Sequence, residues 1–331
     1  MLEEHPFAPI IRTLGKGRHG SRALSMEEAG QAMRMILRGE ALPMQIGAFL
    51  MLLRVKEETA EELAGFVRAI QQHNPPPANL PTPQLDWPAY AGKRRQLPWF
   101  LLAALLLAQN KISVCMHGTG GFDPSRVFVP QALKALGIGE ANSLADAGQR
   151  ILQHNFTFLR LELINSQLEE MLQLRPVLGL RSPINSLARM INPLGADASM
   201  IGIFHPGYRD THQGAAGLLN LPRCAVIKGE GGEAERNPDS ACLVKSSING
   251  NMQETEWPAL LDSRQLKDTS MDSQRLLKVW RGETGDIYGE AAVIATTAVA
   301  LHALGKVDSP SAADKLAKQW WDKRSPELPG A

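Results

Sequence analysis

The sequence predicts an α/β protein with a small all-helical N-terminal domain, a large α/β domain built on a mainly parallel central sheet, and a cleft between them. Three observations predict it. The first seventy-odd residues carry helical apolar spacing and two helix-capping motifs. A run of prolines at 75–77 ends that helical part. Beyond it, short apolar segments alternate with longer helical ones, as in parallel βα units.

Two capping boxes predict where N-terminal helices begin. Ser25 with Glu28, and Thr59 with Glu62, have the spacing in which side chain and backbone satisfy each other. Apolar residues recur at helical spacing at positions 46, 49, 50 and 53, and again at 63, 66, 67 and 70. Pro43 fits the first turn of a helix. We therefore expect helices up to the proline run.

The remainder is expected to alternate strands and helices. Strand candidates lie at residues 112–116, 200–204 and 224–227. Helical segments lie at 129–136, 210–219 and 291–304. The apolar run 99–108 predicts a buried helix, because ten residues are too few to span a bilayer.

Composition restricts the class of protein. A chain of 331 residues can bury one large core or two unequal ones. Cys115, Cys224 and Cys242 are odd in number and far apart, which predicts buried thiols rather than disulfides or a zinc site. The acidic start lacks the features of a signal peptide, so we expect a cytoplasmic protein without a membrane partner.

A net charge of +1 does not by itself indicate nucleic-acid binding, but positive charge is concentrated in two segments. The first segment, eleven residues without an acid, contains Arg12, Lys16, Arg18, His19 and Arg22. The second consists of Lys93, Arg94 and Arg95. A solvated surface and a phosphate-binding surface are both consistent with such clusters.

Residues 39–59 closely resemble the N-terminal signature of anthranilate phosphoribosyltransferase and its relatives in glycosyltransferase family 3, and the likeness continues through 61–65. Residues 181–194 resemble the family's central stretch, and 276–306 resemble its C-terminal helices. These segments occur in the family's order and together cover most of the chain.

This resemblance implies a domain organisation and an assembly. A small helical domain is expected at 1–74, completed by helices from about 161–190. A large α/β domain is expected at 78–331, with the active site between the two. The resemblance also implies a homodimer formed through the small domains.

The family's first functional motif is altered. A Gly-Thr-Gly-Gly-Asp loop holds the pyrophosphate of phosphoribosyl pyrophosphate in these enzymes, and glycine is needed because a missing Cβ lets backbone amides approach phosphate. Alignment on Asp86 places Ala89, Tyr90, Ala91, Gly92 and Lys93 there. Two glycines have become alanine and the acid has become lysine. The hydroxyl and amide donors that follow are replaced at 97–100.

The other functional motifs are partly retained. The Lys-His-Gly-Asn-Arg motif keeps only His117 and Gly118, and the glycines at 118–121 are interpreted as a structural turn or as a secondary anion site. The magnesium-positioning Asp-Glu pair is reduced to Glu235, a retained metal candidate or a plain surface acid. Arg181 matches the arginine that binds the substrate carboxylate, or is a buried arginine bonded to backbone carbonyls.

Asp123 and Arg126 in an Asp-Pro-x-Arg motif, and the segment 229–238, resemble the YbiB-type branch of the family. That resemblance implies a dimeric nucleic-acid binder without sequence specificity and without tryptophan-pathway activity. We predict a non-catalytic or catalytically altered homologue that binds DNA or RNA and requires no cofactor. The predicted contacts are Lys93, Arg94, Arg95, Arg12, Lys16, Arg18, Arg22, Arg175, Arg181 and Arg189.

The alternative is an active transferase that joins phosphoribosyl pyrophosphate to an aromatic or nitrogenous acceptor. It would need Mg²⁺ and would use the retained positions His117, Gly118 and Arg181. Because the family's functional motifs are altered, we assign no residue a catalytic role. A small-molecule ligand in the cleft is compatible with either hypothesis, and a protein-interaction scaffold is a third.

Overall fold

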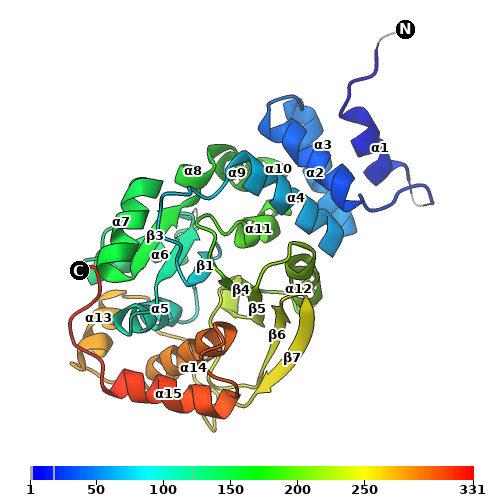
Figure 1. Cartoon of the computed structure of the whole chain (residues 1–331). Helices are drawn as coiled ribbons and strands as arrows, with labels where there is room; N and C mark the ends of the chain where they lie inside the picture. Colours follow the sequence, from blue (N-terminus) through cyan, green and yellow to red (C-terminus); the bar gives the residue numbers. More distant parts are fainter. Residues whose placement is uncertain (1–2, 18, 122) are drawn as a thin grey trace.

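The computed structural model describes residues 3–17, 19–121 and 123–331. Its central sheet has seven strands in the order β3-β2-β1-β4-β5-β6-β7. The neighbours from β3 to β5 pair in parallel, whereas β6 and β7 are antiparallel. This confirms the predicted fold: a small helical N-terminal domain and an α/β domain with a mostly parallel sheet (Figure 1).

The N-terminal part consists of α1 (Ala8–Gly15), α2 (Met26–Leu37), α3 (Pro43–Lys56) and α4 (Ala60–His73). Both predicted capping boxes are confirmed. The Ser25 hydroxyl accepts from the Glu28 amide at 3.2 Å while the Glu28 carboxylate accepts from the Ser25 amide at 2.8 Å, and Thr59 and Glu62 repeat this arrangement. Pro43 begins α3, as its fixed φ favours.

The strands of the larger part are β1 (Leu85–Ala89), β2 (Val114–Gly118), β3 (Phe156–Arg160), β4 (Ala198–Ile203), β5 (Arg223–Lys228), β6 (Cys242–Ile248) and β7 (Asn251–Trp257). The predicted strands correspond to β2, β4 and β5 with ends displaced by up to two residues. The predictions missed β1, β3, β6 and β7. Strand β7 was missed because it is mostly polar and exposed at the edge of the sheet, and so lacks an apolar run.

The remaining helices are α5 (Trp99–Gln109), α6 (Val129–Leu136), α7 (Leu144–His154), α8 (Leu161–Ile164), α9 (Ser166–Leu172), α10 (Arg175–Leu178), α11 (Ile184–Leu187), α12 (Tyr208–Leu218), α13 (Gln274–Arg281), α14 (Ile287–Ala303) and α15 (Pro310–Asp322), with 3-10 turns η1 (Ala188–Met190) and η2 (Glu230–Gly232). The apolar run 99–108 forms the buried helix α5, as predicted. No described helix combines the length and apolar character needed to cross a membrane.

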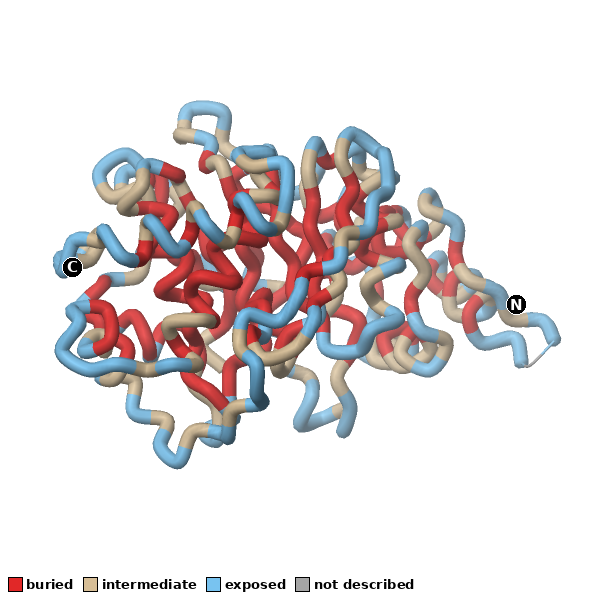
Figure 2. The backbone as a smooth tube through the Cα atoms, turned by 90° about the horizontal axis from the view of Figure 1, so that it is seen from below, coloured by how far each residue is buried: buried red, intermediate tan, exposed pale blue. Residues whose placement is uncertain are grey.

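Alternate strand residues face two separate cores, as the period of a strand requires. Trp87 and Met116 point to the core that contains α5 and α14. Cys115 and Ile201 point to the other core, which also contains apolar residues of α1–α4, α8, α9 and α11. Figure 2 shows buried residues running through the middle of the chain from one part to the other. The N-terminal helices are therefore packed on the larger part through a shared core.

The three cysteines are free and buried, as predicted. Burial raises the pKa of the Cys224 thiol to about 12. A thiol in this state is a small apolar packing group and a poor nucleophile.

Candidate functional site

The candidate site lies where segments following the parallel strands meet, since the carboxyl ends of parallel strands share one edge of a sheet. Residues 90–98 follow β1, residues 119–128 follow β2, and residues 229–235 follow β5. The bridge between Lys93 and Val127 joins the first two of these segments.

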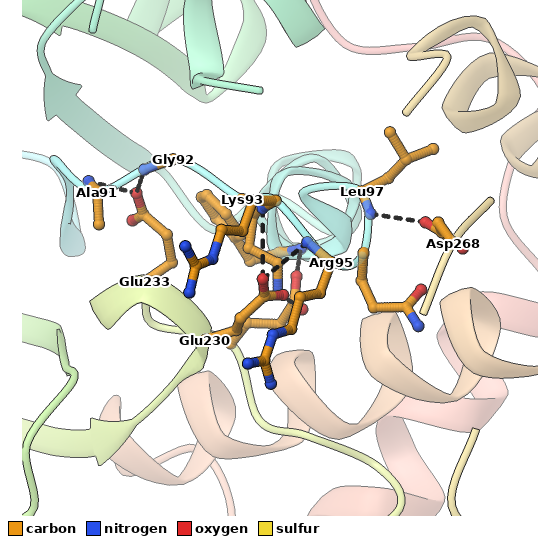
Figure 3. Close-up of polar contacts among 12 residues, drawn as sticks. Ala91, Gly92, Lys93, Arg95, Leu97, Glu230, Glu233 and Asp268 are labelled. Atoms are coloured by element: carbon orange, nitrogen blue, oxygen red, sulfur yellow. Dashed lines mark hydrogen bonds and ion pairs between the residues drawn. The ribbon is translucent and has the colours of Figure 1, made fainter. Parts of the chain in front are cut away.

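A carboxyl group occupies the backbone donors of the segment after β1. The amides of Ala91 and Gly92 donate to one oxygen of Glu233 at 2.6 and 2.5 Å (Figure 3). Glu233 is only 1% exposed. Two successive amides that converge on one oxygen form the kind of concave anion site that binds phosphate in other loops. Here its occupant belongs to the same chain.

Two more glutamates complete this arrangement. The Lys93 ammonium lies 2.5 Å from a Glu235 oxygen and 3.1 Å from a Glu230 oxygen. Glu230 also accepts from the Arg95 amide at 2.8 Å, and Glu235 accepts from the Phe100 amide at 2.8 Å. Phe100 lies in the first turn of α5, where a carboxylate is favourable. We call Glu230, Glu233 and Glu235 the carboxylate clamp.

The clamp is a largely buried cluster in which one ammonium group lies among three carboxyl groups. Burial by itself would lower the pKa of Lys93, but Glu235 and Glu230 outweigh it, so the pKa of the ammonium is raised and it stays charged. Burial raises the pKa of Glu233, and Arg189 and the two backbone amides only partly oppose this. The loop is thus held through charge and through hydrogen bonds that reach across the sheet edge.

Next to the clamp is a cavity of about 510 Å³ that we call the arginine cavity. Its lining includes Arg126, Arg175 and Arg181. Burial and the positive charges of Arg126, Arg175 and Arg189 lower the pKa of Arg181 to about 10, and only Asp123 acts against them. Among the residues that the structure describes, neither Arg175 nor Arg181 has a carboxylate within 4.0 Å. The cavity therefore holds positive charge without a matching anion.

His117 lies in β2 behind the cavity and is fully buried. Its Nε2 is 3.2 Å from a carboxylate oxygen of Asp86 in β1, and its Nδ1 is 2.8 Å from the hydroxyl of Tyr90. Tyr90 lines the cavity. A Cβ on Gly118 would lie 2.0 Å from the Ala89 carbonyl oxygen, so close strand packing alone requires glycine there.

Comparison with known proteins relates both parts of the chain to one group. Residues 8–74 match the family model described as glycosyl transferase family, helical bundle domain. The chain is 29% identical to anthranilate phosphoribosyltransferase of Moorella thermoacetica over 89% of each protein. Over most of its length the chain is therefore similar to anthranilate phosphoribosyltransferases. It is also 30% identical to YbiB of Escherichia coli over 61% of this chain and 64% of YbiB, which is less than two thirds of that protein.

Solved structures of these enzymes share the fold of this chain. Anthranilate phosphoribosyltransferase of Thermus thermophilus superimposes with a TM-score of 0.80 at 24% identity, covering 96% of this chain and 94% of that one. The Saccharomyces cerevisiae enzyme, solved in complex with PRPP and Mg, gives a TM-score of 0.76 at 17% identity, covering 96% and 93%. The resemblance found in the sequence is confirmed.

The structure corrects several of the predictions made for single residues of this chain. Lys93 is not an exposed phosphate contact, because it is 1% exposed and paired with the clamp. Arg189 is also wrong as a surface contact, since it is buried and donates to the backbone carbonyl of Asn185. Glu235 is not a surface acid, and its oxygens are bonded to Lys93 and to the Phe100 amide.

Other predicted contacts do lie at the surface. Arg94, Arg95 and Arg175 are exposed, and Arg181 is half-buried at the arginine cavity. Arg181 has no hydrogen bond to a backbone carbonyl among the described residues. The alternative of a buried arginine bonded to backbone carbonyls therefore describes Arg189 and not Arg181. The described residues contain no group of three or more histidine, cysteine or acidic side chains placed to hold a metal ion.

The N-terminal basic segment is partly neutralised by acids outside it. Arg12 pairs with Glu4. Arg22 pairs with Glu28 at 2.6 Å, and this pair lowers the pKa of Glu28 to about 2. Lys16 is exposed, and Arg18 lies outside the described residues. The segment therefore presents less net positive charge than its sequence indicates.

Replacing the buried ammonium of the clamp tests its structural role. Lys93→Met leaves Glu235 buried without its counter-charge, which should lower the free energy of unfolding by about 3–5 kcal/mol. Denaturant unfolding followed by tryptophan fluorescence measures this. The control Arg95→Met alters an exposed side chain and should change stability by at most ~0.5 kcal/mol. Equal stability of the two variants would contradict the structural role.

The pH dependence of stability tests the burial of Glu233. Because burial raises its pKa in the folded state, Glu233 contributes stability fully below its unfolded pKa and loses that contribution as pH rises through the folded value. Glu233→Gln keeps an acceptor oxygen and cannot titrate. The variant should therefore gain stability relative to the natural chain as pH rises from acid to neutral. Glu256→Gln, at an exposed position of β7, should show no such trend.

Proposed function

We propose that this chain is a non-catalytic homologue of the phosphoribosyltransferases that binds nucleic acid without sequence specificity. The observation that carries the proposal is the carboxylate clamp, because it occupies the backbone donors that a diphosphate would need. Exposed arginines beside the clamp supply the positive charge for a polyanion. A cytoplasmic location and a homodimer form part of the same proposal.

The clamp opposes binding of a ribosyl diphosphate for two reasons. The diphosphate would have to displace Glu233 from the amides of Ala91 and Gly92. It would also bring negative charge beside Glu230 and Glu235, which already surround Lys93. Loss of one preorganised donor costs roughly 3 kcal/mol of transition-state stabilisation, and here several are engaged.

The residues also fit a bound magnesium ion poorly. Magnesium in phosphate sites is held by one or two carboxylates together with substrate phosphates. The buried Ala234 stands in one of the two carboxylate positions of the family motif. Glu235 fills the other but is committed to Lys93. We therefore propose that this chain requires no metal.

Nucleic-acid binding is supported by the positive charges beside the clamp and at the arginine cavity that have no acidic partner among the described residues. Arg94 and Arg95 are adjacent and exposed, and their backbone is fixed by Glu230. Arg175 and Arg181 add charge at the neighbouring cavity. Guanidinium groups bind phosphate oxygens of any sequence, so such a surface supports affinity without specificity.

The proposed homodimer is supported by solvent-exposed apolar side chains in α3 and directly before it. Met44 is 77% exposed and Val55 is 81% exposed. Leu42 precedes the same helix and is 46% exposed. Exposed apolar residues at both ends of one helix favour association, and the N-terminal helices are where the family resemblance placed the dimer contact.

Salt titration tests the nucleic-acid proposal. Binding of labelled duplex DNA and RNA, followed by fluorescence anisotropy, should weaken linearly on a log–log plot against salt, with a slope of about 0.9 per phosphate contact on duplex DNA. The double variant Arg94→Ala/Arg95→Ala should reduce that slope by up to ~1.8, equally for unrelated sequences. The control Arg281→Ala/Lys306→Ala removes the same charge elsewhere on the surface and should leave the slope unchanged. Salt-independent affinity would contradict the proposal.

The competing transferase function has its own test. Calorimetry with phosphoribosyl pyrophosphate and Mg²⁺ should detect no metal-dependent uptake, because the clamp holds the donors. Incubation with anthranilate as acceptor should leave its fluorescence unchanged. A homologous enzyme with an intact glycine loop serves as the positive control. Metal-dependent binding followed by loss of anthranilate would establish the transferase instead.

A further inference from the structure

The proposed function uses the charge of Arg175 and Arg181 but not the enclosed shape and the apolar lining of the arginine cavity. It lies between the turn after β2 and the segment from α9 to α11, next to Tyr90. Its walls combine Arg126, Arg175 and Arg181 with the apolar side chains of Phe128 and Leu172. This mixture of a charged group and apolar walls is typical of a small-ligand site.

The charge balance indicates a ligand with more than one negative charge. Asp123 is the one acid among the described residues of the lining, and it already pairs with Arg126 at 3.2 Å. Arg175 and Arg181 have no carboxylate partner among the described residues, although Arg181 is half-buried. A phosphate monoester carries close to two charges at neutral pH and three acceptor oxygens, which suits several guanidinium groups better than one carboxylate does.

One of the arginines is fixed before any ligand arrives. Arg126 donates to the carbonyl oxygens of Ala91 and Gly92 at 3.1 and 3.0 Å, in the loop that the clamp holds. A preorganised guanidinium loses little conformational freedom on binding. The clamp therefore supports the neighbouring cavity while occupying the loop amides itself.

Size and wall chemistry restrict the rest of the ligand. Small-molecule sites are roughly 300–1,000 Å³, so a cavity of about 510 Å³ accommodates a small molecule rather than a duplex. Phe128 and Pro176 offer apolar surfaces to a planar ring. Gln173 and Asn185 offer amide donors and acceptors in the same lining.

We propose that the arginine cavity binds a single nucleotide through its phosphate monoester. Arg175 and Arg181 hold the phosphate together with Arg126, and the base lies against the apolar wall. The nucleotide is either a free mononucleotide or the 5′-phosphorylated end of a strand. This site is separate from the nonspecific contacts of Arg94 and Arg95 and does not depend on them.

Calorimetry with adenosine 5′-monophosphate tests the site. The natural chain should bind the monophosphate at least roughly tenfold more tightly than adenosine or benzoate, since charged hydrogen bonds supply much of the affinity. Arg181→Gln should weaken binding by roughly tenfold to a hundredfold. Arg281→Gln, an exposed arginine of α13 outside the cavity, should leave it unchanged. Thermal unfolding checks that both variants fold, and Arg175→Gln, at an exposed position, serves if Arg181→Gln does not.

Two oligonucleotides distinguish the sources of the phosphate. If strand ends are bound, a decamer with a 5′-phosphate binds more tightly than the same decamer with a 5′-hydroxyl, and the monophosphate competes with it. If free nucleotides are bound, the monophosphate binds but the two decamers bind alike. No binding of the monophosphate together with equal binding of the decamers overturns the proposal. Tighter binding of benzoate, or monophosphate binding unaffected by either cavity variant, also overturns it.

These outcomes separate this inference from the proposed function. Salt-dependent binding of oligonucleotides without a monophosphate site or a 5′-phosphate preference supports the surface contacts and overturns the cavity proposal. Monophosphate binding without oligonucleotide binding does the reverse.

Discussion

The organisation of the site depends on one set of contacts, between the carboxyl groups of residues 230–235 and the backbone of residues 91–100. These contacts fix the loop after β1 and the first turn of α5, and through the carbonyls of Ala91 and Gly92 they also fix Arg126. A bound anion would impose the same constraint from outside the protein. Here the glutamates that follow β5 supply this constraint, so the loop is held in place without a ligand.

Much of the fold follows from local signals in the sequence. Capping boxes, the proline at the start of α3 and the uninterrupted apolar run of α5 each act within a few residues, so each was predicted correctly. Strand ends were displaced because apolar runs and hydrogen-bonded ladders need not coincide. Strand β7 escaped prediction because its residues are polar and it is specified by pairing with β6, a tertiary interaction.

The site was harder to predict for the same reason. The altered glycine loop and the loss of one motif acid are visible in the sequence once the family resemblance is found. The burial of Lys93 is not, because its partner Glu235 lies 142 residues further along the chain. Three consecutive basic residues therefore suggested one exposed cluster. In the structure Lys93 is buried, whereas Arg94 and Arg95 are exposed. Arg189 was misassigned because its burial is likewise decided by tertiary packing.

The pairing of Lys93 with Glu235 has a consequence for how this chain can change over generations. Any single mutation that restores an acid at residue 93 would place it against Glu235 and Glu230 in a buried setting, where like charges repel. The direct return to an acid at residue 93 therefore passes through a destabilised protein, so the buried pair opposes its own reversal.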